Sequence, residues 1–295
     1  MQKVVIILGP TAVGKSDIGI KLAKIFNGEI ISADSVQVFK GFDIGSAKIS
    51  KEEMDGIKHH CIDIMEPNED FSVFDYVELT KKKIDEIFKK GKLPFIVGGT
   101  GLYVRALLGG YNFGGAGKQQ EFRKSLENVE LSDLYKTLQE KDPERAEELS
   151  PNDRKRIIRA LEVCEFGEKT ENSKPDLDAF VIVLNMDRQK LYERINFRAD
   201  IMLKNGLVDE VKGLLNSGVR VDSQPMKAIG YKEVVSYLNK EIDEKTMEDL
   251  IKQHSRNYAK RQMTFFRSIE NARNYDASKK DETVKNIGKD IKEWL

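Results

Sequence analysis

The run VVIILGPTAVGKS at residues 4–16 joins a strand signal to a loop signal. Its apolar residues 4–8 are about as long as a buried strand, and GPTAVGKS at 9–16 has the spacing G-x-x-x-x-G-K-[ST]. Glycine at both ends lets such a loop wrap around an anion with its amides pointing inward, and the following helix start adds a favourable dipole. The run therefore predicts a strand, a phosphate-binding loop (P-loop) and a helix.

Two side chains of the P-loop have specific roles in phosphate binding. Lys15 would neutralise the terminal phosphates, and the Ser16 hydroxyl would hold a magnesium ion (Mg2+) bound to them. The motif indicates a diphosphate or a triphosphate, but it does not specify a nucleotide. We expect a diphosphate-binding loop made of Gly9, Pro10, Thr11, Ala12, Val13, Gly14, Lys15 and Ser16.

Strand and helix patterns alternate through the first hundred residues, which is typical of an open parallel sheet covered by helices. A second strand pattern at 29–32 precedes Asp34, and a third at 94–97 precedes Gly-Gly-Thr at 98–100. Between them, Ser72 and Asp75 have the spacing of a capping box that opens a helix. We predict the α/β class, with a P-loop NTPase-like parallel sheet flanked by helices.

The pattern changes after the first hundred residues. GGYNFGGAG at 109–117 holds five glycines and indicates a flexible junction. Helical patterns follow, including one in which Ser150 and Pro151 predict an N-cap and a first-turn proline. A strand pattern returns near residue 180, and the C-terminal third is helical. We predict a P-loop core domain of 1–110 and 178–295 with a helical C-terminal part, interrupted by an all-helical insertion domain at 111–177.

Composition limits the class of protein. The 295 residues are 40% hydrophobic and 33% charged, which fits a soluble enzyme, and the apolar runs are far short of the ~20 residues that span a bilayer. Two cysteines are too few for a disulfide framework and favour a reducing compartment. Lys plus Arg and Asp plus Glu balance at 49 each, so a nucleic-acid site must be a local patch. We expect a cytoplasmic monomer without a membrane segment.

The ends of the other strands supply candidate chemistry. Asp34 lies where open parallel sheets place their ligands, and its carboxylate could take a proton from a nucleophile or cap the next turn. Gln37 carries donors and an acceptor that suit an adenine edge. Thr100 adds a hydroxyl beside a glycine-lined backbone. A nucleoside triphosphatase usually anchors magnesium with an aspartate after a hydrophobic strand, but the nearest match, Asp187, is explained by helix capping.

Six stretches closely resemble the bacterial tRNA dimethylallyltransferases, also called tRNA isopentenyltransferases. They occur in the order of that family and cover both the sheet domain and the insertion. Phe39 stands where the family commonly has tyrosine, so a hydroxyl contact there is lost. The stretches are GPTAVGKS at 9–16, DSVQVFKGFDIGSAK at 34–48, IVGGTGLYV at 96–104, PNDRKRIIRALEV at 151–163, KAIGYKE at 227–233 and KRQMTFFR at 260–267.

The resemblance implies a particular reaction. Dimethylallyl diphosphate, rather than ATP, would occupy the P-loop, and the exocyclic amine of the adenosine just 3′ of the anticodon would attack its first carbon. On this analogy Asp34 is the general base and Thr100 positions the reacting groups. Lys15 and a Ser16-bound magnesium ion would stabilise the departing pyrophosphate. The adenine must flip out of its stack to present its amine.

Two basic clusters are candidates for RNA contact. The run 252–267 contains five Lys or Arg residues and no acid, which favours a phosphate track over an ordinary solvated face. A second cluster at 154–159 lies on a helix of the insertion. The resemblance assigns both clusters to tRNA, with the predicted contacts Asp34, Ser35, Val36, Gln37, Thr100, Arg123, Lys155, Arg156, Arg159, Lys227, Lys232, Lys260, Arg261 and Arg267.

Two alternatives stay open at this point. A P-loop small-molecule kinase would consume ATP and use no prenyl donor. Prenyl transfer to a free adenosine phosphate would use the same donor, but a small acceptor needs no basic helix to hold RNA.

Overall fold

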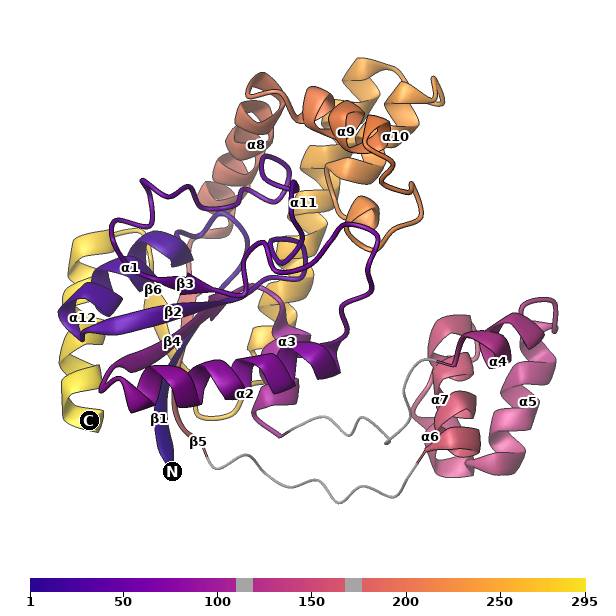
Figure 1. The fold of residues 1–295 in the computed structure, drawn as a ribbon, viewed down its shortest axis with the longest axis horizontal. Helices are drawn as coiled ribbons and strands as arrows, with labels where there is room; N and C mark the ends of the chain where they lie inside the picture. The colour runs from indigo at the N-terminus through magenta and orange to yellow at the C-terminus, as the bar shows by residue number, and fades with distance from the viewer. Residues whose placement is uncertain (110–118, 168–176) are drawn as a thin grey trace. The chain divides into compact units, whose positions relative to one another are not determined.

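The computed structural model describes residues 1–109, 119–167 and 177–295 (Figure 1). The chain divides into two compact units, a larger one of Met1–Leu108 with Pro175–Leu295 and a smaller one of Gly109–Lys174. Apart from Gly109, the glycine-rich junction expected at 109–117 lies outside the described residues. In the described part of the chain, no helix is both long and apolar enough to cross a membrane.

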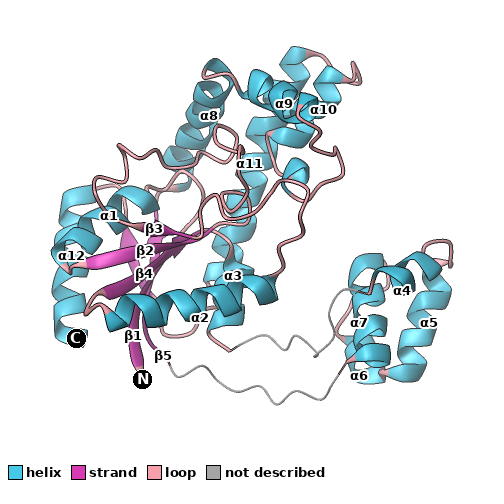
Figure 2. Ribbon diagram, in the orientation of Figure 1, coloured by secondary structure: helices cyan, strands magenta, loops and turns pink. Residues whose placement is uncertain are grey.

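A parallel six-stranded sheet forms the centre of the larger unit, with helices on both faces (Figure 2). The strand order is β3-β2-β4-β1-β5-β6, so the strand that precedes the P-loop lies inside the sheet. The predicted α/β class is confirmed. The strands are β1 (Gln2–Leu8), β2 (Gly28–Ala33), β3 (His59–His60), β4 (Leu93–Gly98), β5 (Leu177–Asn185) and β6 (Arg273–Asp276).

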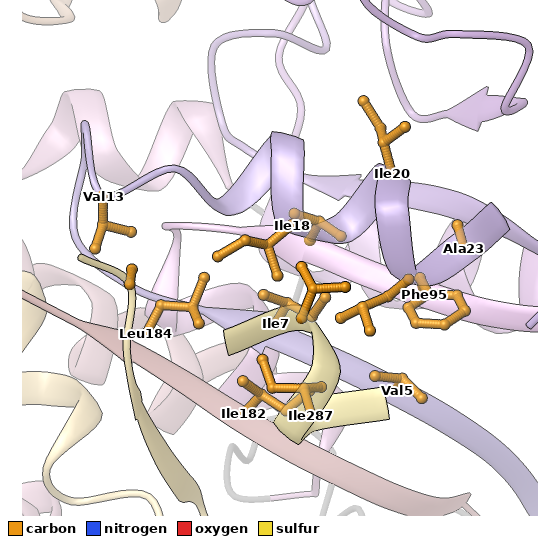
Figure 3. Close-up of a cluster of buried hydrophobic side chains, with 14 of the residues drawn as sticks. Val5, Ile7, Val13, Ile18, Ile20, Ala23, Phe95, Ile182, Leu184 and Ile287 are labelled. Carbon is orange, nitrogen blue, oxygen red and sulfur yellow. The ribbon is translucent and has the colours of Figure 1, made fainter. Parts of the chain in front are cut away.

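The apolar run of β1 is explained by burial on both of its faces. Val5 and Ile7 belong to one cluster with Ile18 of the first helix and Ile287 of the last (Figure 3). Alternate residues of a strand point to opposite faces, and all five residues 4–8 are fully buried. Each such side chain contributes about 1.5–3 kcal/mol relative to exposure. The sheet therefore gives the P-loop a rigid base.

Helices of the larger unit cover the sheet and extend beyond its edge. The predicted capping box is confirmed, because Ser72 Oγ accepts from the Asp75 amide and Asp75 Oδ2 accepts from the Ser72 amide at 2.8 Å. The helices are α1 (Lys15–Ile25), α2 (Val73–Lys89), α3 (Gly101–Leu107), α8 (Arg188–Lys204), α9 (Leu207–Asn216), the 3-10 helix Pro225–Lys227, α10 (Tyr231–Leu238), α11 (Glu244–Phe266) and α12 (Lys280–Trp294).

The C-terminal region departs from the helical expectation at one place. Strand β6 pairs in parallel with β5 and extends the sheet, and it is followed by α12. Its sequence RNYD is mostly exposed and has no hydrophobic alternation. The pairing is therefore set by the tertiary structure rather than by a local pattern.

Four short helices surround a small core in the other unit. Leu134, Leu138, Ile157 and Leu161 are buried together. The predicted N-cap at Ser150 is wrong, because Asp153 caps the last of these helices by accepting from the Arg156 amide at 3.2 Å. The described residues of this unit form no strand, and its helices are α4 (Gln120–Ser125), α5 (Leu131–Lys141), α6 (Pro143–Glu147) and α7 (Arg154–Phe166).

Candidate active site and nucleic-acid interface

The P-loop connects β1 to α1 and has a backbone that depends on its glycines. Gly14 has a φ of 100° at the N-cap of α1, in the left-handed region where a side chain is strained. A Cβ at Gly9 would lie 2.8 Å from the Leu184 carbonyl oxygen, so only glycine fits against β5. Lys15 Nζ donates to the Pro10 carbonyl at 2.8 Å. The Lys15 side chain thus bridges the C-terminal end of the P-loop to its N-terminal end.

Two helices that are distant in sequence hold the P-loop backbone. Arg194 of α8 donates from Nε to the Ala12 carbonyl at 2.9 Å. Gln262 of α11 is buried; its Oε1 accepts from the Thr11 amide and its Nε2 donates to the Gly99 carbonyl, both at 2.9 Å. A single amide side chain therefore connects the P-loop to the turn after β4.

Three charged groups converge beside this loop. Burial, followed by the charge of Arg198, lowers the pKa of Lys15 to about 7, while the nearby Asp34 carboxylate acts in the opposite direction. Burial also lowers the pKa of Arg198, again against the effect of Asp34. Two cations held this close to each other favour an anionic ligand.

Asp34 directly follows β2, and its carboxylate binds the backbone of the next turn. Its Oδ1 accepts from the amides of Val36 at 2.8 Å and Gln37 at 3.2 Å. The capping role considered for Asp34 is therefore present, and it fixes the orientation of the carboxylate. Its charge also acts on Lys15 and Arg198, so the same side chain is placed to accept a proton near a bound anion.

Thr100 lies next to Asp34 because their strands are neighbours in the sheet. The Thr100 amide donates to the Ala33 carbonyl at 3.1 Å, which joins the ends of β4 and β2. Burial and the charge of Asp34 raise the pKa of Tyr258 to about 12, while hydrogen bonds with Thr100 and Gln262 oppose this shift. The phenol of Tyr258 is thus a neutral neighbour of the site.

The amide of Gln37 has a fixed orientation. Its Nε2 donates to the carbonyls of Ser46 at 3.2 Å and Ala47 at 3.4 Å, while Ser32 Oγ lies 3.4 Å from its Oε1. Ser35 and Val36 are half-buried beside it. Phe39, at the position where the family commonly has tyrosine, is fully buried against Phe42, with ring centroids 6.4 Å apart.

Comparison with known proteins finds relatives over most of the chain. A family model described as IPP transferase matches residues 37–269. A tRNA dimethylallyltransferase from an Exiguobacterium species is 49% identical over 271 residues, which cover 90% of this chain and 87% of the relative. This chain belongs to the tRNA dimethylallyltransferase family. The resemblance based on six motifs is confirmed.

Solved structures of the family have the same fold. The full-length tRNA isopentenylpyrophosphate transferase of Bacillus halodurans superimposes with a TM-score of 0.77 at 42% identity, over 99% of this chain and 96% of that one. A eukaryotic dimethylallyltransferase acting on tRNA superimposes with a TM-score of 0.82 at 26% identity, over 99% of this chain and 78% of that one. The P-loop NTPase-like sheet is therefore the fold of this family.

The five Lys and Arg residues of the run 252–267, which form the basic stripe of α11 and of the residue after it, divide into two parts. Lys252 pairs with Asp200, and Arg256 donates to Asn196, so the first part binds α8. Lys260, Arg261 and Arg267 are exposed. Only this second part of the stripe is available as a phosphate track.

Lys227 and Lys232 flank the turn before α10, and both are exposed. The buried Glu233 holds this turn, since its Oε2 accepts from the Gly230 amide at 2.7 Å and its Oε1 lies 2.6 Å from His254 Nδ1. The turn is thereby fixed to α11, the helix that carries the exposed cations.

In the smaller unit, several predicted RNA contacts also have structural partners. Glu162 is fully buried and accepts hydrogen bonds from Arg123 at 2.6 and 2.9 Å and from Arg159 at 2.6 Å. Arg154 donates to the carbonyls of residues 126, 127 and 129 after α4. Lys155 and Arg156 are exposed, so they are the stronger candidates for RNA contact in this unit.

Glu162 is expected to stabilise the smaller unit. Burial alone would raise its pKa, but hydrogen bonds from Arg123, Arg159 and the Gln119 amide outweigh burial and hold the pKa at about 2. This pKa lies below the ordinary value, so the stabilisation is present above pH 4.5 and is lost as the pH falls toward 2. Glu162→Ala should destabilise the unit by roughly 3 kcal/mol.

Hydrogen exchange of residues 119–167 at neutral pH measures this loss. Glu165→Ala is the matched control, because Glu165 lies on the same helix in a half-exposed pair with Lys141. Equal protection in the two variants would contradict the assignment of Glu162.

The sequence patterns do not predict four residues of the site, which are Arg194, Arg198, Tyr258 and Gln262. The two arginines are four residues apart on α8 and therefore share a face, which is the one signal that could have indicated them. Gln262 and Tyr258 lie within a segment that stands out for its basic residues. Their role comes from packing against loops more than 150 residues away.

Proposed function

We propose that this protein transfers the dimethylallyl group from dimethylallyl diphosphate to the exocyclic amine of the adenosine immediately 3′ of the anticodon in tRNA, releasing pyrophosphate. The observation that carries the proposal is the convergence of Lys15, Arg198 and Asp34 at the mouth of the P-loop. Two cations suit a diphosphate leaving group, and a carboxylate that interacts with both of them and binds the Gln37 amide suits removal of a proton. A cytoplasmic, monomeric protein remains our prediction.

The donor would bind through the P-loop. The amides at the start of α1, the Lys15 ammonium and the Arg198 guanidinium would hold the diphosphate oxygens. The exposed Ser16 hydroxyl next to Lys15 fits magnesium, which takes oxygen ligands and would draw the others from the diphosphate and water. When bound, magnesium would supply further charge neutralisation to the leaving group. Among the described residues no cluster of His, Cys, Asp and Glu could hold it alone.

In the proposed transfer, the adenine nitrogen forms a bond to the first carbon of the donor while the carbon–oxygen bond to diphosphate breaks. The nitrogen becomes cationic and gives its proton to Asp34. Lys15 and Arg198 stabilise the negative charge that develops on pyrophosphate. Thr100, fixed to the end of β2 through its amide, would position the reacting groups beside Asp34.

Recognition of adenine would use the fixed amide of Gln37. Its Nε2 already has acceptors within the loop, the carbonyls of Ser46 and Ala47. Its Oε1 keeps acceptor capacity and suits an N–H of the base. The base must leave its stack to reach this position, as in other enzymes that modify bases.

The two alternatives find less support. Asp187, the nearest match to the magnesium-anchoring aspartate of a kinase, caps α8 by accepting from the amides of Gln189 and Lys190 at 3.1 Å. Three exposed cations lie at the end of α11: Lys260, Arg261 and Arg267. They suit the phosphates of an RNA backbone, whereas a free adenosine phosphate would not need them.

The acceptor can be tested directly. Purified protein, magnesium and labelled dimethylallyl diphosphate are incubated with an unmodified anticodon stem-loop whose anticodon is followed by adenosine, or with AMP. We expect label in the RNA and little in AMP. Label in AMP alone would replace the RNA acceptor with a free nucleotide.

Donor binding is expected to take up a proton above pH 7. The free Lys15 ammonium has a pKa of about 7, so at pH 8 it is mostly neutral, and a bound diphosphate raises that pKa by favouring the charged form. Titration calorimetry in buffers of different ionisation enthalpy, without RNA, should show an uptake approaching one proton at pH 8 and almost none at pH 6. Uptake that is independent of pH, after correction for the donor's own ionisation, would exclude Lys15 as its source.

The exposed part of the α11 stripe is expected to contribute to RNA affinity through charge. Changing Lys260 and Arg261 to alanine should weaken tRNA binding and reduce the slope of log K against log salt by about 1–2, since each phosphate contact contributes about 0.7–0.9. The control changes Lys285 and Lys289, which are exposed on α12. The assignment fails if both double variants keep the wild-type slope.

A further inference from the structure

A single carboxylate of α9 holds a turn of the loop that contains Gln37. Glu210 Oε2 accepts from the amides of Ile44 at 2.7 Å and Asp43 at 3.1 Å. Its Oε1 accepts from the Gly45 amide at 3.2 Å and from the Tyr231 hydroxyl at 2.7 Å. Three consecutive backbone amides thus point at one side chain, a charge-assisted arrangement that fixes the turn.

Packing around Glu210 leaves the turn little freedom. Tyr231 is fully buried, and its ring centroid lies 4.7 Å from that of Phe42. A Cβ at Gly45 would lie 2.6 Å from the Tyr231 ring, so glycine is required there. The turn is therefore pressed against α10 while Glu210 binds its amides.

The carbonyls that follow the anchored amides reach both halves of the active site. Ser46 and Ala47 accept from Gln37 Nε2, on the side proposed for the adenine. The Ser46 carbonyl also lies 3.5 Å from Arg198 Nη2, on the side proposed for the diphosphate. The geometry of residues 43–47 therefore sets the orientation of one residue for each substrate.

We propose that Glu210 is a positioning residue for prenyl transfer: by binding the amides of residues 43–45 it presents Gln37 to the adenine and Arg198 to the diphosphate. This inference rests on the function proposed above. A second residue also supports the loop, because the buried side chain of Lys48 binds the Asp43 and Asp63 carboxylates and the Phe39 carbonyl. Loss of Glu210 should therefore loosen the turn without unfolding the loop.

Glu210→Gln tests the proposal with an almost isosteric change. A glutamine side chain has one oxygen instead of two, and its NH2 group would face backbone donors. We expect kcat/KM for the RNA to fall about tenfold, as for a lost charged hydrogen bond, with faster hydrogen exchange at residues 43–45 and an unchanged exchange pattern in the sheet. Glu210→Asp, which keeps the charge but is one methylene shorter, should show an intermediate loss.

Two controls separate positioning from general stability. Asp209→Asn changes an exposed carboxylate on the same helix, and Tyr231→Phe removes one bond to Glu210 while the three amide bonds remain. Both should keep most of the activity. In a Gln37→Ala background the effect of Glu210→Gln should shrink to a few-fold, because part of its action passes through Gln37.

The outcomes are distinguishable. If the wild-type protein prenylates RNA but Glu210→Gln matches Asp209→Asn, or loses the same factor with and without Gln37, the positioning role is overturned while the function stands. If Glu210→Gln is unfolded, a folded Glu210→Asp variant with fast exchange at residues 43–45 and full kcat/KM overturns it equally. A wild-type protein that prenylates no RNA rejects the proposed function itself.

Discussion

Replacing Asp34 with asparagine is expected to lower kcat for prenyl transfer by about a hundredfold or more, the contribution of a positioned general base. Asparagine keeps an oxygen that can accept from the Val36 and Gln37 amides, so the turn that Asp34 caps should remain folded. It cannot take the proton released by the attacking amine. Single-turnover rates with saturating donor and RNA measure the loss, and filter binding should give an RNA affinity close to that of the wild type.

Asp187→Asn is the matched control for this variant. Asp187 caps α8, and asparagine caps helices equally well, so activity should stay near the wild-type value. In a kinase-like site, where Asp187 would anchor magnesium, this change would be severe. Full activity in Asp34→Asn together with a loss in Asp187→Asn would reverse the proposed roles.

Replacing Lys15 with methionine should lower kcat/KM for the donor by about 10²–10³-fold, which is typical for loss of one group that stabilises transition-state charge. The ammonium interacts with Arg198 and Asp34, the two other charged groups of the site. Methionine keeps the length and the apolar stem. Steady-state kinetics with the donor varied at saturating RNA give the effect.

Lys21→Met provides the comparison, because Lys21 lies on the same helix in a largely exposed pair with Asp281. It should behave like the wild type. Unchanged donor kinetics in Lys15→Met would reject the P-loop as the diphosphate site, since the change removes the one lysine that closes the loop.

Much of the fold could be predicted from local sequence signals. The run at 4–16 predicts its strand, loop and helix because burial on both faces demands an apolar run and the anion demands glycines at fixed positions. Strand β6 could not be predicted, because its four mostly exposed residues pair with β5 only through the tertiary structure. Local patterns indicate what an element buries, and β6 buries little.

The candidate site was predictable only in the parts that are contiguous in sequence. Asp34 and Thr100 follow strand patterns, and parallel neighbours bring strand ends together. Gln262 and Arg198 reach the same place from α11 and α8, whose positions no local pattern determines. The basic clusters show a related limit of sequence patterns. The sequence reveals the charge of Arg159, but it does not reveal that the buried Glu162 binds this side chain.

The central claim is that the P-loop holds an allylic diphosphate whose prenyl group passes to an RNA amine beside Asp34. The most direct measurement offers the protein labelled dimethylallyl diphosphate and γ-labelled ATP together, with magnesium and unmodified tRNA, and analyses the nucleosides after digestion. We predict a prenylated adenosine from the position 3′ of the anticodon, released pyrophosphate and intact ATP. Consumption of ATP with no prenylated nucleoside would contradict the claim.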